Sequence, residues 1–205
     1  MRYLILGAGQ QGRAIAFDLL REEDNEVVLA DSDADLLEDV YSWLDDPRAD
    51  LEPLDAERRE EVRAAMEDAD VAINALPYRF NLEVTTDAIT TGTHLVDLGG
   101  NNDVTAAQLE LDAEAREAGI VVIPDCGLAP GLANILASDA ADRLSRVESV
   151  RIRVGGLPQR PQGELEYMLT FNVEGLLNEY GETVYAVRDG DLVTVEPLMD
   201  VERLN

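Results

Sequence analysis

The chain has 205 residues, 46% of them hydrophobic, which suffices for one large domain or for one domain and part of a second. Its 43 acidic residues against 16 basic ones give a formal net charge of -27, so nucleic acid and anionic membranes are poor partners. All 16 basic residues are arginine, which excludes chemistry that depends on a lysine side chain, such as a Schiff base.

No apolar run approaches the roughly 20 residues that a membrane-spanning helix needs. Residues 1–9 lack the long apolar region and the cleavage site of a signal peptide. We therefore predict a cytoplasmic protein. The acidic excess predicts adaptation to high intracellular salt, because screening relaxes the repulsion between carboxylates. A stability that falls as salt is raised to molar levels would contradict that interpretation.

The first expected element is an apolar strand at residues 3–6, which is followed at once by a G-x-G-x-x-G turn and then by a helix. This order is a dinucleotide-binding fingerprint. Gly7 suits the tight turn, Gly9 lets the backbone approach a pyrophosphate, and Gly12 lets the helix pack on the strand. The helix N-terminus adds unpaired N–H groups and a positive dipole end. We expect cofactor contacts at Gly7, Gly9, Gln10, Gln11 and Gly12.

Residues 25–31 predict a second strand, which ends in Asp31, 19 residues after Gly12. A carboxylate at this position accepts hydrogen bonds from the ribose hydroxyls of an adenosine and repels a 2'-phosphate. The residues that follow, Ser32 among them, add further acids and no arginine. The sequence therefore predicts that NAD is preferred to NADP, with Asp31 and Ser32 in contact with it.

Strand and helix patterns then alternate along the chain. Strands are expected at 49–55, 70–77, 93–100 and 120–125, and helices at 56–68, 81–92 and 104–119. The alternation predicts an α/β fold, a doubly wound parallel sheet of the Rossmann type, whose ligands lie beyond the carboxyl ends of the strands. Further cofactor contacts are therefore expected at Ala75, Leu76, Pro77, Tyr78, Leu98, Gly99 and Cys126. For Tyr78, an ordinary surface role is an equally good interpretation.

The pattern changes after Gly131. A helix is expected at 132–145, strands at 149–156 and 165–171, a short helix at 173–180, and a hairpin over 183–198 whose turn is Asp189-Gly190. We expect two domains, a cofactor-binding domain at 1–130 and a partial, mainly antiparallel α+β domain at 131–205 for substrate binding or dimerisation. The second domain is expected to be incomplete, because its strand edges call for a cover.

Two carboxylates follow predicted strands at the expected active-site edge, Asp97 and Asp125. Either side chain could bind a cationic amine or move a proton, and either could instead cap a helix or anchor a loop. Cys126 is interpreted as a small side chain packed beside the cofactor, because hydride transfer needs no thiol nucleophile. With one cysteine and His94 as the only histidine, we predict no metal site.

Four stretches resemble the saccharopine dehydrogenase-like family: "VDLGGN" at 96–101, "DCGLAPGLANIL" at 125–136, residues 154–180, and "YAVRDGDLVTVEPL" at 185–198. Within the family they most resemble the branch of L-lysine 6-dehydrogenase. Family members are roughly twice as long, and their second domain is inserted after the sixth strand. The sequence is therefore expected to be naturally short or a fragment.

The resemblance implies NAD-dependent oxidation of the amine carbon of lysine or a related amino acid, with hydrolysis of the resulting imine. Two alternatives stay open: reductive joining of an amine and a carbonyl, as in saccharopine or carboxynorspermidine formation, and cofactor binding without turnover. The Lys-His pair described for lysine-forming members cannot operate here, because the chain has no lysine. Expected partners are a small amino acid or amine substrate and a second copy of the chain.

Overall fold

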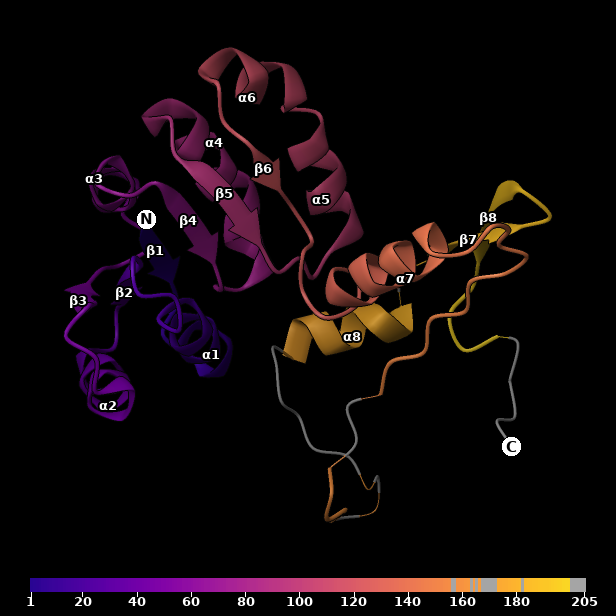
Figure 1. The fold of residues 1–205 in the computed structure, drawn as a ribbon, viewed down its shortest axis with the longest axis horizontal. Coiled ribbons are helices and arrows are strands. Elements are labelled where there is room, and N and C mark those ends of the chain that lie inside the picture. The colour runs from indigo at the N-terminus through magenta and orange to yellow at the C-terminus, as the bar shows by residue number, and fades with distance from the viewer. Residues whose placement is uncertain (156–157, 163, 165, 167–172, 182, 200–205) are drawn as a thin grey trace. The chain divides into compact units, whose positions relative to one another are not determined.

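The computed structural model describes residues 1–155, 158–162, 164, 166, 173–181 and 183–199 (Figure 1). The chain divides into two compact units. The first comprises residues 1–99 and 103–152, and the second comprises residues 100–102 and 153–205. This division differs from the boundary expected after residue 130, which stays a prediction about domains. Among the described residues, no helix is long and apolar enough to cross a membrane.

The first unit is built on a six-stranded sheet in which every neighbouring pair is parallel. Its strands, in spatial order, are β3 (Ala49–Pro53), β2 (Glu26–Asp31), β1 (Arg2–Leu6), β4 (Val71–Asn74), β5 (His94–Asp97) and β6 (Val122–Ile123). The order reverses between β1 and β4, which confirms the predicted doubly wound α/β sheet and places a ligand crevice at this switch point.

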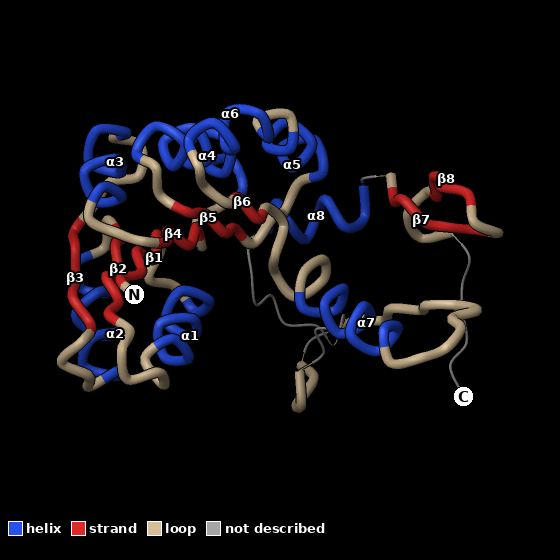
Figure 2. Tube along the Cα trace, turned by 45° about the horizontal axis from the view of Figure 1, so that its top comes forward, coloured by secondary structure: helices blue, strands red, loops and turns tan. Residues whose placement is uncertain are grey.

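Helices cover both faces of this sheet (Figure 2). On one face lie α1 (Gln10–Leu19) and α2 (Ala34–Leu44), and on the other lie α3 (Arg59–Glu67), α4 (Asn81–Thr91), α5 (Asn102–Leu109) and α6 (Asp112–Ala118). The α2 helix was missed in the sequence, although Asp33 is a favourable N-cap residue. The Asp33 side chain accepts a hydrogen bond from the backbone N–H of Leu36 at 3.0 Å.

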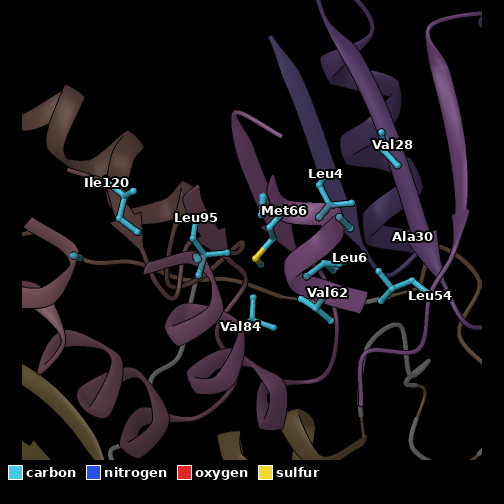
Figure 3. Close-up of a cluster of buried hydrophobic side chains, with 14 residues drawn as sticks. Leu4, Leu6, Val28, Ala30, Leu54, Val62, Met66, Val84, Leu95 and Ile120 are labelled. Atoms are coloured by element: carbon cyan, nitrogen blue, oxygen red, sulfur yellow. The ribbon is translucent and has the colours of Figure 1, made fainter. Parts of the chain in front are cut away.

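Strand residues alternate between two apolar cores, one beneath each helical layer. Leu4 and Leu6 join the core toward α3 and α4 (Figure 3), whereas Ile5 joins the core toward α1 and α2. Because both faces are covered, the strands are apolar almost throughout. Burying each leucine or isoleucine of this kind stabilises the fold by roughly 1.5–3 kcal/mol. The cores thus fix the strand ends that carry the candidate site.

An ion-pair cluster joins α3 to α4. The Asp87 carboxylate, whose side chain is only 2% exposed, accepts hydrogen bonds at 2.6 Å from both Arg59 and Arg63. The hydrogen bond that Arg59 donates to the Asp87 carboxylate raises the pKa of Arg59 above its ordinary value. A buried carboxylate shared by two guanidinium groups therefore holds together α3 and α4, the helices that precede and follow β4 in the chain.

Several element predictions need correction. The helix expected at 104–119 is two helices, α5 and α6, separated at Glu110 and Leu111. The sixth strand pairs only at Val122–Ile123, because Pro124 has no N–H to donate to the ladder. Residues 149–155 form no strand despite their apolar alternation, since no strand among the described residues pairs with them.

The second unit contains α8 (Val173–Gly181) and a hairpin of β7 (Val184–Arg188) and β8 (Asp191–Val195). Its turn residues Asp189 and Gly190 have φ of 55° and 92°, as a two-residue hairpin turn requires. The short helix and the hairpin are therefore confirmed. The strand expected at 165–171 lies outside the described residues, apart from Glu166. The helix α7 (Leu132–Asp142), expected at 132–145, falls in the first compact unit.

Candidate functional site

The glycine turn links β1 to α1 at the carboxyl edge of the sheet. Gly7 has φ of 99°, which favours glycine, and its N–H donates to the Ala30 carbonyl oxygen at 2.8 Å. A Cβ added at Gly12 would overlap the Gly7 carbonyl oxygen, whereas a Cβ at Gly9 would meet nothing within 4 Å. The turn is therefore closed beneath the helix and open above it, and Gln10 and Gln11 lie exposed at the start of α1. These residues fit a dinucleotide phosphate.

Asp31 ends β2 directly beside this turn. One of its carboxylate oxygens accepts the Ala8 N–H at 2.8 Å, and the other accepts the Asp33 N–H at 3.0 Å. A carboxylate offers about four acceptor positions, so two positions are left for ribose hydroxyls. Asp31 is partly exposed and Ser32 is exposed. The carboxylate is therefore both fixed in position and accessible to a ligand.

A pocket opens over Asp31, which we call the acidic pocket because Asp31, Asp55 and Glu57 line it together. Its other lining residues are Leu6, Gly7, Ala30, Ser32, Leu54, Ala56, Leu76, Pro77, Arg79 and Phe80. Arg79 is its one cationic lining residue, and the guanidinium carbon lies 4.6 Å from the centre of the Phe80 ring. Arg79 forms no ion pair with any of the described residues.

A second group of polar side chains lies buried behind the turns that follow β4, β5 and β6. We call it the amide network: Asn74, Asn81, Thr85, Asp97 and Gln108, each at most 3% exposed. The Leu76 N–H donates to Asn74 Oδ1 at 3.2 Å, Asn74 Nδ2 donates to Asn81 Oδ1 at 2.9 Å, and Asn81 Nδ2 donates to Asp97 Oδ1 at 3.1 Å. The chain of hydrogen bonds thus ends on a carboxylate.

Asp97 receives hydrogen bonds from three further groups. Its Oδ1 accepts the N–H of Gly99 at 2.8 Å and that of Asp125 at 3.0 Å, and its Oδ2 accepts Gln108 Nε2 at 2.6 Å. The residue is fully buried. Three of the four donors thus converge on Oδ1 and one reaches Oδ2. Because the carboxylate has no exposed surface and meets these protein donors, the geometry favours an anchoring role for Asp97 over the proton-transfer role that was one of its two interpretations.

Asp125 and Cys126 lie at the same point, in the turn after β6. Asp125 has a left-handed backbone, with φ of 57°, and a Cβ added at Gly99 would overlap its carboxylate. The Cys126 N–H donates to the Asp97 carbonyl oxygen at 2.8 Å, and the cysteine is partly exposed. The turns after β5 and β6 are thus packed together, and Asp125, unlike Asp97, is a partly exposed carboxylate.

The remaining expected contacts lie at the same edge. Ala75, Leu76, Pro77 and Tyr78 follow β4 and are all partly exposed, and Tyr78 begins the short 3-10 helix η1 (Tyr78–Phe80). Leu98, partly exposed, follows β5. The structure therefore brings every expected site residue to one edge of the sheet, and whether each contacts a cofactor stays a prediction. Sequence reasoning missed Asn81, Gln108 and Arg79. Only Arg79, a basic residue directly after a strand-end turn, carried a signal.

Comparisons with known proteins agree on one relationship. The family described as saccharopine dehydrogenase NADP binding domain matches residues 3–123, and the saccharopine dehydrogenase C-terminal domain family matches residues 127–204. A saccharopine dehydrogenase (NADP(+), L-glutamate-forming) of Saccharomyces cerevisiae is 26% identical over 94% of this chain and 43% of its own. The mitochondrial alpha-aminoadipic semialdehyde synthase of Rattus norvegicus is 24% identical over 95% of this chain and 21% of its own.

Solved structures show the same fold. Apo saccharopine dehydrogenase (L-Glu forming) from Saccharomyces cerevisiae superposes with a TM-score of 0.71 at 24% identity, covering 95% of this chain and 44% of that one. GenD2 from gentamicin A biosynthesis, in complex with NAD, has a TM-score of 0.50 at 15% identity, covering 70% and 39%. The chain spans less than half the length of these relatives.

Proposed function

The chain belongs to the saccharopine dehydrogenase family, and from that premise we propose that it binds NAD and forms part of an oxidoreductase acting on a carbon–nitrogen bond of an amino acid. The proposal has two parts. NAD binding is proposed for the domain of residues 1–130, and amino-acid oxidation is proposed for the whole protein. NAD would accept the hydride, while residues of this chain hold the dinucleotide and shield the reacting carbon from water.

The Asp31 carboxylate carries the preference for NAD. It is fixed by the N–H groups of Ala8 and Asp33 and lines a pocket that contains two further acids. A 2'-phosphate placed at this point would face their negative charges with Arg79 as the one cation lining the pocket. Each unit of like charge at close range costs several kcal/mol in a partly buried site. The pocket therefore supports NAD.

NADP remains the second candidate, and a specific observation favours it. The matched family is described as NADP binding, and the yeast relative is named for NADP(+). The residues at the end of β2 favour NAD over NADP, because Asp31, Ser32 and Asp33 offer no cation to a 2'-phosphate. We infer that the preference of this chain differs from the one in the names of its relatives.

Cofactor titration tests this part. We expect calorimetry on the purified chain to give an NAD dissociation constant at least tenfold below that of NADP. The variant Asp31→Asn removes the charge at constant shape and should reduce the ratio of the NADP to the NAD dissociation constant several-fold. Asp33→Asn is the matched control, because asparagine is an equally good N-cap. Equal affinities of the unmodified chain for NAD and NADP would overturn the role given to Asp31.

Oxidation of lysine, or of a related primary amine, is the first candidate reaction. We propose the partly exposed Asp125, in the turn after β6, as the carboxylate that holds a substrate ammonium group or takes a proton from it. Saccharopine oxidation is the second candidate, since the yeast relative is named saccharopine dehydrogenase. Both reactions oxidise a carbon bonded to nitrogen, so a shared cofactor face serves either.

Turnover assays on the whole protein separate these candidates. Reduction of NAD with lysine supports the first, and reduction only with saccharopine supports the second. Activity only with an amine and a carbonyl compound together would support reductive joining. Cofactor binding without turnover on any of these substrates would leave a binding protein. Size measurement of the same sample tests the proposed homodimer.

A further inference from the structure

Asp97 has a carboxylate that contacts no solvent and forms no ion pair within the described part of the chain. Burying a polar or charged group is costly unless hydrogen bonds replace its water. Here Gly99, Asp125 and Asn81 supply three N–H donors to Oδ1, and Gln108 supplies one to Oδ2. An apolar residue at this point would pack a core at lower cost, so the buried acceptor calls for a reason beyond packing.

The direction of the amide network supplies that reason. A carboxylate accepts hydrogen bonds only, so Asn81 must present its Nδ2 to Asp97 and its Oδ1 to Asn74. Asn74 must then present its own Oδ1 to the Leu76 N–H. Each amide is oriented by the one before it, and the charge of Asp97 sets the orientation of all of them.

Three turns are therefore held by one side chain. Asp97 accepts directly from the turn after β5 through Gly99 and from the turn after β6 through Asp125, and it reaches the turn after β4 through two amides that end on Leu76. In doubly wound sheets the second half, formed by these strands, takes the second mononucleotide of a dinucleotide. For NAD that mononucleotide carries the nicotinamide.

We propose that Asp97 is a positioning residue, which fixes the turns after β4, β5 and β6 as the wall against which the nicotinamide end of the cofactor lies. The inference rests on the proposed NAD binding and goes beyond it, because it assigns this half of the site to a group that never touches the cofactor. Asp97 acts through the backbone of Leu76, Gly99 and Asp125. The function requires an oxygen acceptor at the place of Oδ1, which takes the hydrogen bonds of Gly99, Asp125 and Asn81.

Gln108 identifies the variant that preserves this function. Its Oε1 is buried and has no hydrogen-bond partner, so a turned Gln108 amide could present that oxygen to an asparagine Nδ2 at position 97, with loss of the hydrogen bond from Gln108 Nε2 to Thr85 Oγ1. Asp97→Asn thereby keeps Oδ1 for Gly99, Asp125 and Asn81 and gains a partner for its amide nitrogen. Asp97→Ala removes the acceptor and leaves the turns without their anchor.

The test compares NADH with ADP-ribose, which lacks the nicotinamide, by calorimetry on the chain. Asp97→Ala is expected to raise the dissociation constant of NADH about tenfold and that of ADP-ribose less than threefold. Asp97→Asn should leave both within threefold of the unmodified chain. Gln108→Ala is the matched control, since it opens the same network without touching a turn. It should lower the melting temperature and leave the ratio of the two constants unchanged.

Each other outcome overturns a stated part. An equal loss for both ligands in Asp97→Ala, or no loss for either, refutes positioning while NAD binding stands. A tenfold loss of NADH affinity in Asp97→Asn refutes the acceptor role. If Asp97→Ala does not fold, Asn81→Ala replaces it and should weaken NADH selectively by about threefold, and an unchanged NADH affinity there refutes the inference. An unmodified chain that binds neither ligand refutes the proposed function itself.

Discussion

The acidic pocket and the amide network lie at the same edge of the sheet and are built in opposite ways. In the pocket, Asp31 is partly exposed and keeps acceptor positions free. In the network, Asp97 is fully buried and accepts four hydrogen bonds from the protein. A carboxylate after a parallel strand can therefore recognise a ligand or organise the turns around it, and exposure decides between these roles.

A substitution in the glycine turn is expected to have the largest effect, because this turn supports both the acidic pocket and the amide network. A valine at Gly12 would place its side chain on the Gly7 carbonyl oxygen beneath the turn. We expect Gly12→Val to abolish NAD binding in calorimetry and to destabilise the fold by about 3 kcal/mol or more in urea unfolding. The control Gly9→Ala has open space above it and should keep the stability while weakening NAD binding. A normal melting curve and normal affinity for Gly12→Val would contradict the close packing.

The Asp87 cluster separates stability from cofactor recognition. Asp87→Ala leaves Arg59 and Arg63 without their shared carboxylate, and we expect a loss of about 2–3 kcal/mol in urea unfolding, less than for a fully buried pair because both arginines are partly exposed. The NADH to ADP-ribose ratio should not change, since Asp87 lies away from the turns of the site. The triple variant Arg59→Met, Arg63→Met, Asp87→Leu, which removes all three charges, should recover part of the stability. If Asp87→Ala changed the ratio of the NADH and ADP-ribose dissociation constants, that ratio would respond to any loss of stability and not to the position of the turns.

Much of the acidic pocket was predictable from the sequence, and most of the amide network was not. The glycines and Asp31 are close in sequence, and their spacing reflects one βαβ unit with known geometry. Asn81 and Gln108 lie 16 and 11 residues from Asp97, in helices whose rotation on the sheet decides whether they meet it. Sequence spacing carries no information about that rotation. The carboxylate at 97 could thus be placed at the edge, but its burial could not be foreseen.

The fold shows the same limit in the part of the chain after Gly131. The Asp189-Gly190 hairpin was predictable, because the turn itself specifies the pairing of the strands beside it. The alternating residues at 149–155 were expected to form a strand and do not, since alternation describes a pattern that pairing has to complete. Local turn chemistry is therefore a more reliable guide here than periodicity.

Arg79 offers the mildest and most specific test of the comparison, because it adds a cation to the acidic pocket without taking part in the network. Its guanidinium carbon lies 4.6 Å from the centre of the Phe80 ring, and Arg79 lines the acidic pocket together with Leu54 and Ala56. A planar cation in that place would stack on an adenine ring, a contact worth about 0.5–1 kcal/mol at an exposed site. We expect Arg79→Met to raise the NAD and ADP-ribose dissociation constants equally, by about two- to fivefold, so that the ratio altered by Asp97→Ala stays constant. Arg79→Lys keeps the positive charge but removes the planar guanidinium group. Its dissociation constants should therefore match those of Arg79→Met if stacking is the contact. A loss of affinity confined to NADP would instead indicate that Arg79 contacts the 2'-phosphate. The repulsion of that phosphate by Asp31 would then be opposed by the attraction of Arg79, and the preference for NAD would depend on which of the two is larger.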